Sequence, residues 1–186
     1  MFIKKSLLAL VVSIGLSGCL GSHYYVLSTA SQPQHTYRYS NMSIGVEKVT
    51  VPEYLFKREI AVAKSSSEVI FLSDGTWAED LDASLTLRVI SYLQKKFNQP
   101  NVHAYPWEFN TQPSKRVQIQ VSRFIAQGDR VYLDATWQVE DMRTQRKKAR
   151  LFSTTVAVEG NSATSIVKAM DRAFSKLETS VAEGIK

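Results

Sequence analysis

The chain contains a single cysteine, Cys19, among its 186 residues. One cysteine cannot form an internal disulfide framework or a zinc site built from several cysteines. The three histidines, His23, His35 and His103, are too dispersed to indicate a metal site. With 44% hydrophobic residues and a formal net charge of +6, the composition does not resemble that of a disordered, collagen-like or multi-span membrane protein. This length suits one globular domain.

Motifs of catalysis and nucleotide binding are missing as well. There is no GxSxG around a serine nucleophile, no Gly-rich loop ending in Lys-Ser or Lys-Thr, and no HExxH. Asp80 and Asp82 are two residues apart on an expected helix and would lie on different faces. We therefore expect a protein that is not an enzyme and needs no cofactor or metal. The mild basic excess is only a weak pointer to nucleic acid, and we expect no nucleic-acid partner.

The first 18 residues have the layout of an export signal. Lys4 and Lys5 provide the positive start, and the apolar run Leu7–Leu16 falls well short of the ~20 residues that a membrane-spanning helix needs. The segment Leu16-Ser17-Gly18-Cys19 resembles the bacterial lipobox, in which the cysteine is acylated and becomes the new N-terminus. The alternative is an ordinary secreted protein with a chance cysteine at the cleavage site.

Acylation of Cys19 would divide the chain into three parts. Residues 1–18 would be a lipoprotein signal peptide, residues 19–28 the lipidated N-terminus with the first strand, and residues 29–186 a single domain. Leu20 stands after the cysteine, where Asp would favour retention in the inner membrane, so we expect the periplasmic leaflet of the outer membrane. The tether from Leu20 to His23 reaches only ~14 Å when extended, which keeps the domain close to the membrane.

Hydrophobic periodicity predicts two β-rich halves, each followed by a helix. The expected strands are 23–28, 42–51, 59–64, 68–72, 117–125, 130–140 and 152–158. Residues 29–41 are expected to form a loop. Asp74-Gly75 indicates a turn, and Thr76 with Glu79 matches a capping box that would start a helix ending at Phe97.

The expected faces of these elements predict the core. Val117, Ile119, Val121 and Ile125 are expected on one face of their strand. The first helix has an apolar stripe, whereas Asp82, Arg88 and Lys96 are expected to face water; the stripe consists of Leu81, Leu85, Val89, Leu93 and Phe97. A second stripe from Ile166 to Ile185 predicts a terminal helix. The fold class is therefore α/β, a single-domain, two-layer sandwich of a mainly antiparallel sheet with two amphipathic helices.

A basic run is the first candidate contact surface. It comprises Arg143, Arg146, Lys147, Lys148 and Arg150 and crosses an expected hairpin turn. These cations could meet anionic lipid headgroups or an acidic partner. The alternative is a solvated turn that charge keeps soluble.

Aromatic residues mark two further candidates. Tyr105, Trp107 and Phe109 lie in an otherwise polar connection, where they would form a binding face or pack over a sheet edge. The segment Pro52-Glu53-Tyr54-Leu55 is either a structural corner or part of a contact surface.

An ordered set of segments resembles the ABC-type transport auxiliary lipoproteins, in particular their PqiC-like (YmbA-like) branch. The set begins with Cys19 and continues with Tyr24-Tyr25-Val26-Leu27, the stretch Val46–Leu55, and Trp77-Ala78-Glu79-Asp80-Leu81 at a helix start. The family pattern tends to read Trp-Ala-x-Pro-Leu, so Asp80 replaces a proline here. The resemblance spans nearly the whole chain after the leader.

The resemblance implies a part in a paraquat-inducible type of transport system. In such systems an MCE-domain (PqiB-like) tunnel protein, with a membrane-permease partner, moves phospholipid across the periplasm, and the auxiliary lipoprotein docks the tunnel at the outer membrane. A homo-oligomeric ring would suit a coaxial tunnel. The alternative is a periplasmic carrier lipoprotein that holds an acyl chain between helix and sheet. An envelope hydrolase with an unrecognised site is a third possibility.

Overall fold

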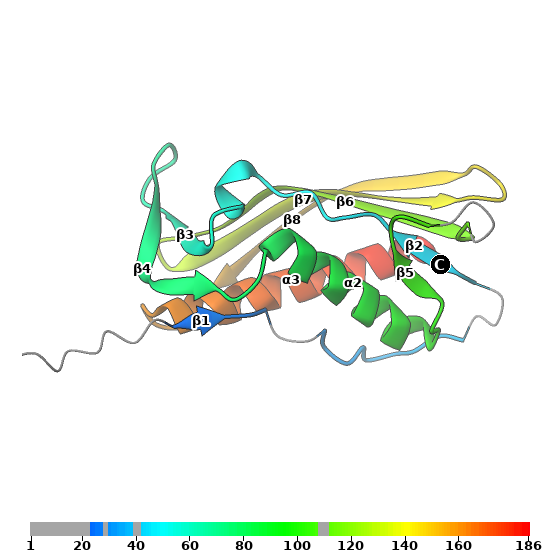
Figure 1. Ribbon diagram of the computed structural model, residues 1–186, viewed down its shortest axis with the longest axis horizontal. Helices are drawn as coiled ribbons and strands as arrows, with labels where there is room; N and C mark the ends of the chain where they lie inside the picture. The colour runs from blue at the N-terminus through cyan, green and yellow to red at the C-terminus, as the bar shows by residue number, and fades with distance from the viewer. Residues whose placement is uncertain (1–22, 28–29, 39–41, 108–111) are drawn as a thin grey trace, which may run out of the picture.

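The computed structural model describes residues 23–27, 30–38, 42–107 and 112–186 (Figure 1). The leader, Cys19 and Phe109 lie outside these residues. The elements in chain order are β1 (Tyr24–Tyr25), β2 (Ile44–Val46), the 3-10 turn η1 (Glu53–Leu55), β3 (Glu59–Ala63), β4 (Val69–Trp77), α2 (Leu81–Phe97), β5 (Val102–Ala104), β6 (Lys115–Gln127), β7 (Arg130–Asp141), β8 (Lys147–Ala157) and α3 (Ala163–Ile185).

One sheet and two helices form two layers. The eight strands belong to a single sheet, and α2 and α3 cover the same face of it (Figure 1). The long ladders are antiparallel and the short ones are parallel. The predicted two-layer α/β sandwich in one domain is confirmed. Among the described residues, no helix has the length and apolar character that crossing a membrane would require.

A β-bulge in β6 changes which residues face the core. The register with β7 shifts between Val121 and Arg123, and beyond the shift Phe124 lies opposite Leu133. Phe124 and Leu133 are both fully buried. Ile125 therefore points to the other face of the sheet, and the prediction that it shares a face with Val121 is wrong. One extra residue inverts the alternation for the rest of the strand.

Two short strands share the second edge of β6. Ile44 of β2 lies opposite Lys115 near the start of β6, and Val62 of β3 lies opposite Ala126 near its end. β5 extends the sheet beyond β2, whereas β4 and then β1 extend it beyond β3. The sheet thus has one end that carries β2 and β5 and another that carries β1, β3 and β4.

α2 begins later than the sequence predicts. Asp74, Gly75 and Thr76 lie inside β4, where the N–H of Thr76 donates to His23 O at 3.1 Å and that of Trp77 donates to Arg58 O at 2.6 Å. The predicted turn and capping box are wrong, because pairing with the β1 and β3 segments supplies the backbone partners of this stretch. Asp80 takes the N-cap position in an extended conformation.

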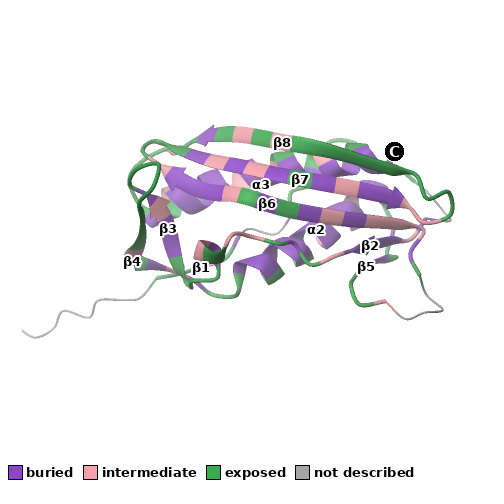
Figure 2. Cartoon of the chain, turned by 90° about the horizontal axis from the view of Figure 1, so that it is seen from above, coloured by how far each residue is buried: buried purple, intermediate pink, exposed green. Residues whose placement is uncertain are grey.

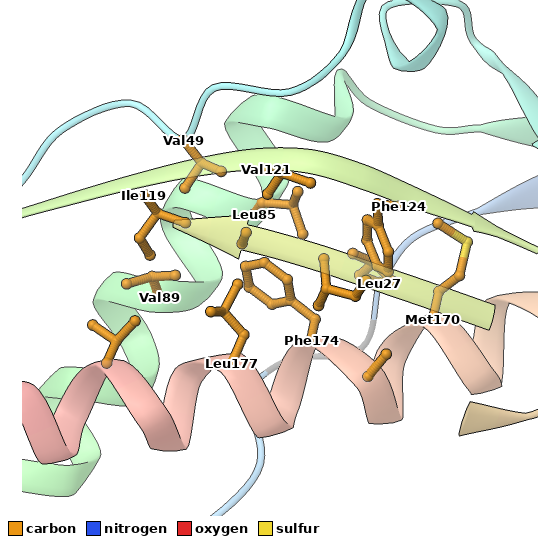
Figure 3. Packing of buried hydrophobic residues seen from close by; sticks show 14 of the residues in the cluster. Leu27, Val49, Leu85, Val89, Ile119, Val121, Phe124, Met170, Phe174 and Leu177 are labelled. Atoms are coloured by element: carbon orange, nitrogen blue, oxygen red, sulfur yellow. The ribbon is translucent and has the colours of Figure 1, made fainter. Parts of the chain in front are cut away.

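The helix stripes pack against the core face of the sheet (Figure 3). Leu85 and Val89 of α2 and Phe174 and Leu177 of α3 are fully buried, and they face β6 around Phe124. Both predicted stripes are confirmed, because every residue named in the α2 stripe and both ends of the α3 stripe are buried.

Trp137 fixes α3 against β7. Its indole Nε1 donates to Ser180 Oγ at 3.0 Å, and its ring lies against Gly184, where a Cβ atom would overlap it. The small residue on the last turns of α3 therefore lets the helix approach the sheet closely.

Candidate functional site

Asp141 organises the turn between β7 and β8. Its Oδ1 accepts hydrogen bonds from the backbone N–H groups of Arg143 and Thr144, both at 3.0 Å, and its Oδ2 accepts one from Lys115 Nζ at 2.7 Å. The bond from Lys115, followed by the backbone bond from Thr144, holds the pKa of Asp141 well below its ordinary value. An ionised carboxylate thus shapes the turn that exposes Arg143 and Arg146.

The basic run predicted from the sequence forms what we call the basic edge. Its members are all exposed: Arg143, Arg146, Lys147, Lys148 and Arg150. Lys147 Nζ lies 3.7 Å from Glu140 Oε1, and Lys148 Nζ donates to the carbonyl of Glu183 at 3.1 Å. Within the described ranges, no ion pair involves the side chains of the three arginines. The basic edge therefore presents arginines that are open to a partner.

β8 gives this edge an open backbone. Among the described strands it pairs only with β7, so its other side lacks strand partners for its N–H and C=O groups. At its far end the carbonyl of Ala157 accepts a hydrogen bond from Arg172 Nη2 at 2.8 Å. Figure 2 shows β8 exposed along much of its length. Leu151, next to the cations, is 88% exposed. Charge, open backbone groups and one apolar side chain thus lie together.

The aromatic candidates divide between packing and exposure. Trp107 Nε1 donates to the carbonyl of His103 at 3.3 Å, and the Trp107 ring occupies the space where Gly45 would carry a Cβ atom. Tyr105 meets the Trp107 ring edge-on at 5.2 Å between centroids and is itself 62% exposed. Trp107 thus covers β2, and Tyr105 is the side chain that a partner could reach.

The segment Pro52-Glu53-Tyr54-Leu55 forms a corner around η1. Tyr54 Oη accepts a hydrogen bond from the backbone N–H of Phe124 at 3.1 Å, just beyond the β-bulge. Burial raises the pKa of the Tyr54 phenol, although that hydrogen bond opposes the shift. Leu55 is buried, and Pro52 is half-buried. The corner fills the stretch of the β6 edge between β2 and β3.

The three candidate surfaces do not form one site. The basic edge lies on β8 and Tyr105 follows β5, at opposite edges of the order β5-β2-β6-β7-β8. Four strand spacings separate these edges, or about 19 Å. The corner lies farther along β6. In the described parts of the chain, no group of three or more His, Cys, Asp or Glu residues is placed to hold a metal.

A polar groove on the uncovered sheet face was not anticipated. It encloses about 410 Å³ between the β2–η1 connection and strands β6 and β7. Gln118 Nε2 donates to Glu47 Oε2 at 2.7 Å, and Gln138 Nε2 donates to Gln118 Oε1 at 3.2 Å. The alternating polar residues of β7 were its signal in the sequence. Gln118 thus links Glu47 to Gln138 across the groove.

A buried ionic network between the helices was also missed. Arg88 lies inside the domain, with its Nε 3.1 Å from Glu178 Oε1, and it also contacts Asp171 and Ser175. The prediction that Arg88, Asp82 and Lys96 face water is wrong. Burial raises the pKa of Glu178 to about 7; Arg88 opposes this shift.

Sequence relatives were found for this chain. The family described as "ABC-type transport auxiliary lipoprotein component" matches residues 25–182. A curated relative from Escherichia coli (strain K12), "Intermembrane transport lipoprotein PqiC", is 29% identical over 94 residues, which cover 48% of this chain and 50% of the relative. The protein of the same name from Shigella flexneri matches equally. The chain spans about half the length of the curated relatives it matches.

Solved structures share the fold. A crystal structure of an uncharacterized protein has a TM-score of 0.74 at 18% identity and covers 89% of this chain and 99% of its own. A crystal structure of a Xanthomonas campestris protein also has a TM-score of 0.74, at 14% identity, with coverage of 87% and 93%. These similarities concern the fold alone.

Proposed function

The chain belongs to the family of ABC-type transport auxiliary lipoproteins, and on that premise we propose that it docks the tunnel protein of an intermembrane transport system. In this proposal it is anchored in the periplasmic leaflet of the outer membrane and receives an MCE-domain protein, whose membrane-permease partner lies at the other membrane. It acts by binding and has no catalytic step. The name that the PqiC relatives carry, intermembrane transport lipoprotein, supports this class of process.

The observation that carries the proposal is the separation of the two ends of the domain. β6 runs for 13 residues, which corresponds to about 40 Å at 3.3 Å per residue. β1, the first described strand, lies at one end of this length, which we call the N-terminal end. The turn of the basic edge lies at the other, which we call the distal end (Figure 1). A domain tethered at its N-terminal end would present the basic edge away from the bilayer.

Acylation of Cys19 supplies the tether in this proposal. Each buried CH₂ of an acyl chain contributes about 0.8 kcal/mol, so one chain binds a bilayer only marginally, whereas two or three anchor a protein stably. Mass spectrometry of the mature protein should find acyl chains on Cys19. When exported with a leader that is removed without lipid attachment, Cys19→Ala protein should fold and appear in the soluble fraction. An unmodified N-terminus on the wild-type protein would contradict the proposal.

The basic edge suits an acidic partner surface. Arg143 and Arg146 can each offer two parallel N–H groups to a carboxylate, which is the strongest pairing available to a surface cation. The open side of β8 can add backbone hydrogen bonds from an extended segment, and Leu151 can add an apolar contact. In a homo-oligomeric ring, several such edges would surround one axis, as a coaxial tunnel requires.

Charge reversal tests this assignment. Tagged Arg143→Glu/Arg146→Glu protein, solubilised in mild detergent, should lose the MCE-domain protein that wild type retains. The matched control is Arg130→Glu/Lys168→Glu, because it makes the same change in charge at exposed positions away from the distal turn. Equal recovery of the tunnel protein by both variants would reject the basic edge as the contact. Failure of the wild type to recover it would reject docking itself.

The alternative function is a carrier that holds an acyl chain between helix and sheet. The space between α3 and the sheet is filled by side chains that are at most 1% exposed: Phe124, Met170, Phe174 and Leu177 (Figure 3). Trp137, also 1% exposed, packs between β7 and α3. This packing favours docking over carriage. Native mass spectrometry distinguishes them, because a carrier should retain lipid in stoichiometric amount and a docking domain should not.

A further inference from the structure

The β3–β4 hairpin exposes apolar side chains on both of its faces. Val69, Ile70 and Phe71 are consecutive in β4 and are 38%, 42% and 40% exposed. Because successive strand residues point to opposite faces, neither side of this hairpin is fully covered. Its tip rises on the side of the sheet away from the helices, at the N-terminal end (Figure 1). We call these residues, with the neighbouring Phe56, which is 60% exposed, the hairpin patch.

Cations border the hairpin patch. Lys57 Nζ lies 5.8 Å from the centroid of the Phe71 ring, and Lys57 itself is exposed. Lys64, at the turn of the hairpin, pairs with Glu68 at 3.2 Å. Aromatic and aliphatic side chains next to long cationic ones suit the boundary between the acyl chains and the headgroups of a bilayer. In that position the apolar groups leave water and the ammonium group meets phosphate.

The hairpin patch is also within reach of the proposed anchor. β1 runs parallel to β4, with Tyr24 opposite Thr76. The chain therefore enters β1 from the direction in which β4 begins. Cys19 precedes Tyr24 by five residues. Five extended residues span at most about 17 Å, so lipid on Cys19 can lie beside the N-terminal end, which also carries the hairpin patch.

We propose that the hairpin patch inserts into the surface of the phospholipid bilayer beside the lipid anchor. A bilayer covers both faces of a hairpin at once, whereas a groove on a protein would cover one face and leave the other in water. The inference rests on the proposed lipid anchoring and is independent of the docking of a tunnel protein. It gives the domain a second membrane contact, which would fix the orientation that a single anchor point leaves free.

A fluorescent label tests the insertion directly. Cys19 is the sole cysteine, so once it is acylated a thiol introduced elsewhere carries the label alone. We would label Ile70→Cys and, as the matched control, Leu151→Cys, which replaces an exposed aliphatic residue of β8. Each intact lipoprotein is reconstituted into phosphatidylethanolamine–phosphatidylglycerol vesicles that contain nitroxide-labelled lipid. The label at position 70 should shift to shorter wavelength and lose emission to the nitroxide, whereas the label at position 151 should do neither.

The outcomes separate the two proposals. If the protein floats with vesicles but position 70 behaves like position 151, the insertion is wrong and the anchoring stands. If the wild-type protein neither floats nor carries acyl chains, the anchoring fails and the insertion fails with it. A shorter wavelength at position 70 without nitroxide quenching would indicate contact between protein copies and would also overturn the insertion. Phe56→Cys, on another element of the patch, should repeat the result expected for position 70.

Discussion

Replacing Glu178 by Gln should make the protein more stable at neutral and alkaline pH, although it removes one partner of a buried ion pair. Glu178 is 0% exposed and lies 3.1 Å from Arg88 Nε. Burial raises the pKa of its carboxyl group from 4.5 to about 7, with Arg88 opposing and Asp171 adding to the shift. The substitution keeps the shape of the side chain and removes its ability to ionise.

The sign follows from proton binding. Between about pH 4.5 and pH 7 the folded protein holds a proton on Glu178 that the unfolded chain has released. The free energy of unfolding therefore falls as pH rises through this window and levels off above it. At 1.36 kcal/mol per pKa unit, the full loss is about 3 kcal/mol. The amide of the E178Q variant has no proton to release in this range, so E178Q should match wild type near pH 4 and exceed it by about 3 kcal/mol near pH 8.

Urea unfolding followed by tryptophan fluorescence measures this difference. Wild type and E178Q are unfolded in the same detergent across the pH window, and only the difference between them is interpreted, because other groups titrate in both. Glu183→Gln is the control, since it removes an exposed carboxylate from the same helix. If E178Q becomes less stable than wild type as pH rises, Glu178 acts as a stabilising carboxylate partner of Arg88 and the reasoning is refuted.

Three further substitutions test the packing. Leu133→Asp should leave no folded protein, because an unpaired charge at a fully buried position costs several kcal/mol; a soluble protein with a cooperative thermal transition would contradict this. Gly184→Ala should cost about 1–3 kcal/mol in urea unfolding, because the added methyl overlaps the Trp137 ring, and an unchanged midpoint would mean that α3 moves freely. Tyr54→Phe should cost about 1–3 kcal/mol by leaving the N–H of Phe124 without its partner; stability equal to wild type would show that water replaces the hydroxyl.

Local periodicity correctly predicted the elements that have a long, regular pattern of apolar residues, namely β7 and most of α2. The alternation from Arg130 to Glu140 and the spacing of Leu85, Val89 and Leu93 each repeat over several turns or residue pairs, and the structure confirms both. The prediction of where α2 starts was wrong, because Thr76 lies in β4 and this stretch pairs with the β1 and β3 segments, which come from earlier in the chain. Strand pairing can replace a capping box at such a position, because either one supplies partners for the backbone groups. The local sequence does not show which of the two will form.

The candidate surfaces show the same division. The exposure of Arg143 and Arg146 follows from their charge, and the motif around Cys19 is contiguous in the sequence. That the basic edge and Tyr105 lie on opposite sheet edges depends on the strand order, which periodicity does not contain. The exposure of Val69 to Phe71 was also missed, because an apolar run of this length predicts a strand and normally its burial. Arg88 was predicted to face water because the sequence does not show that Glu178 is its partner. Glu178 lies on the apolar side of α3.

The brevity of β1 has a mechanical consequence. A pull through the proposed lipid anchor would enter the domain through Tyr24 and Tyr25, which pair with β4 at two positions. The hydrogen bonds from Thr76 N to His23 O and from Ala78 N to Tyr25 O would carry that load first. If these hydrogen bonds break, β1 separates from β4 and the tether becomes longer. The long ladders of β6, β7 and β8 would carry no load at that stage. The buried Leu27 and Ala30, which follow β1, would then take the load next.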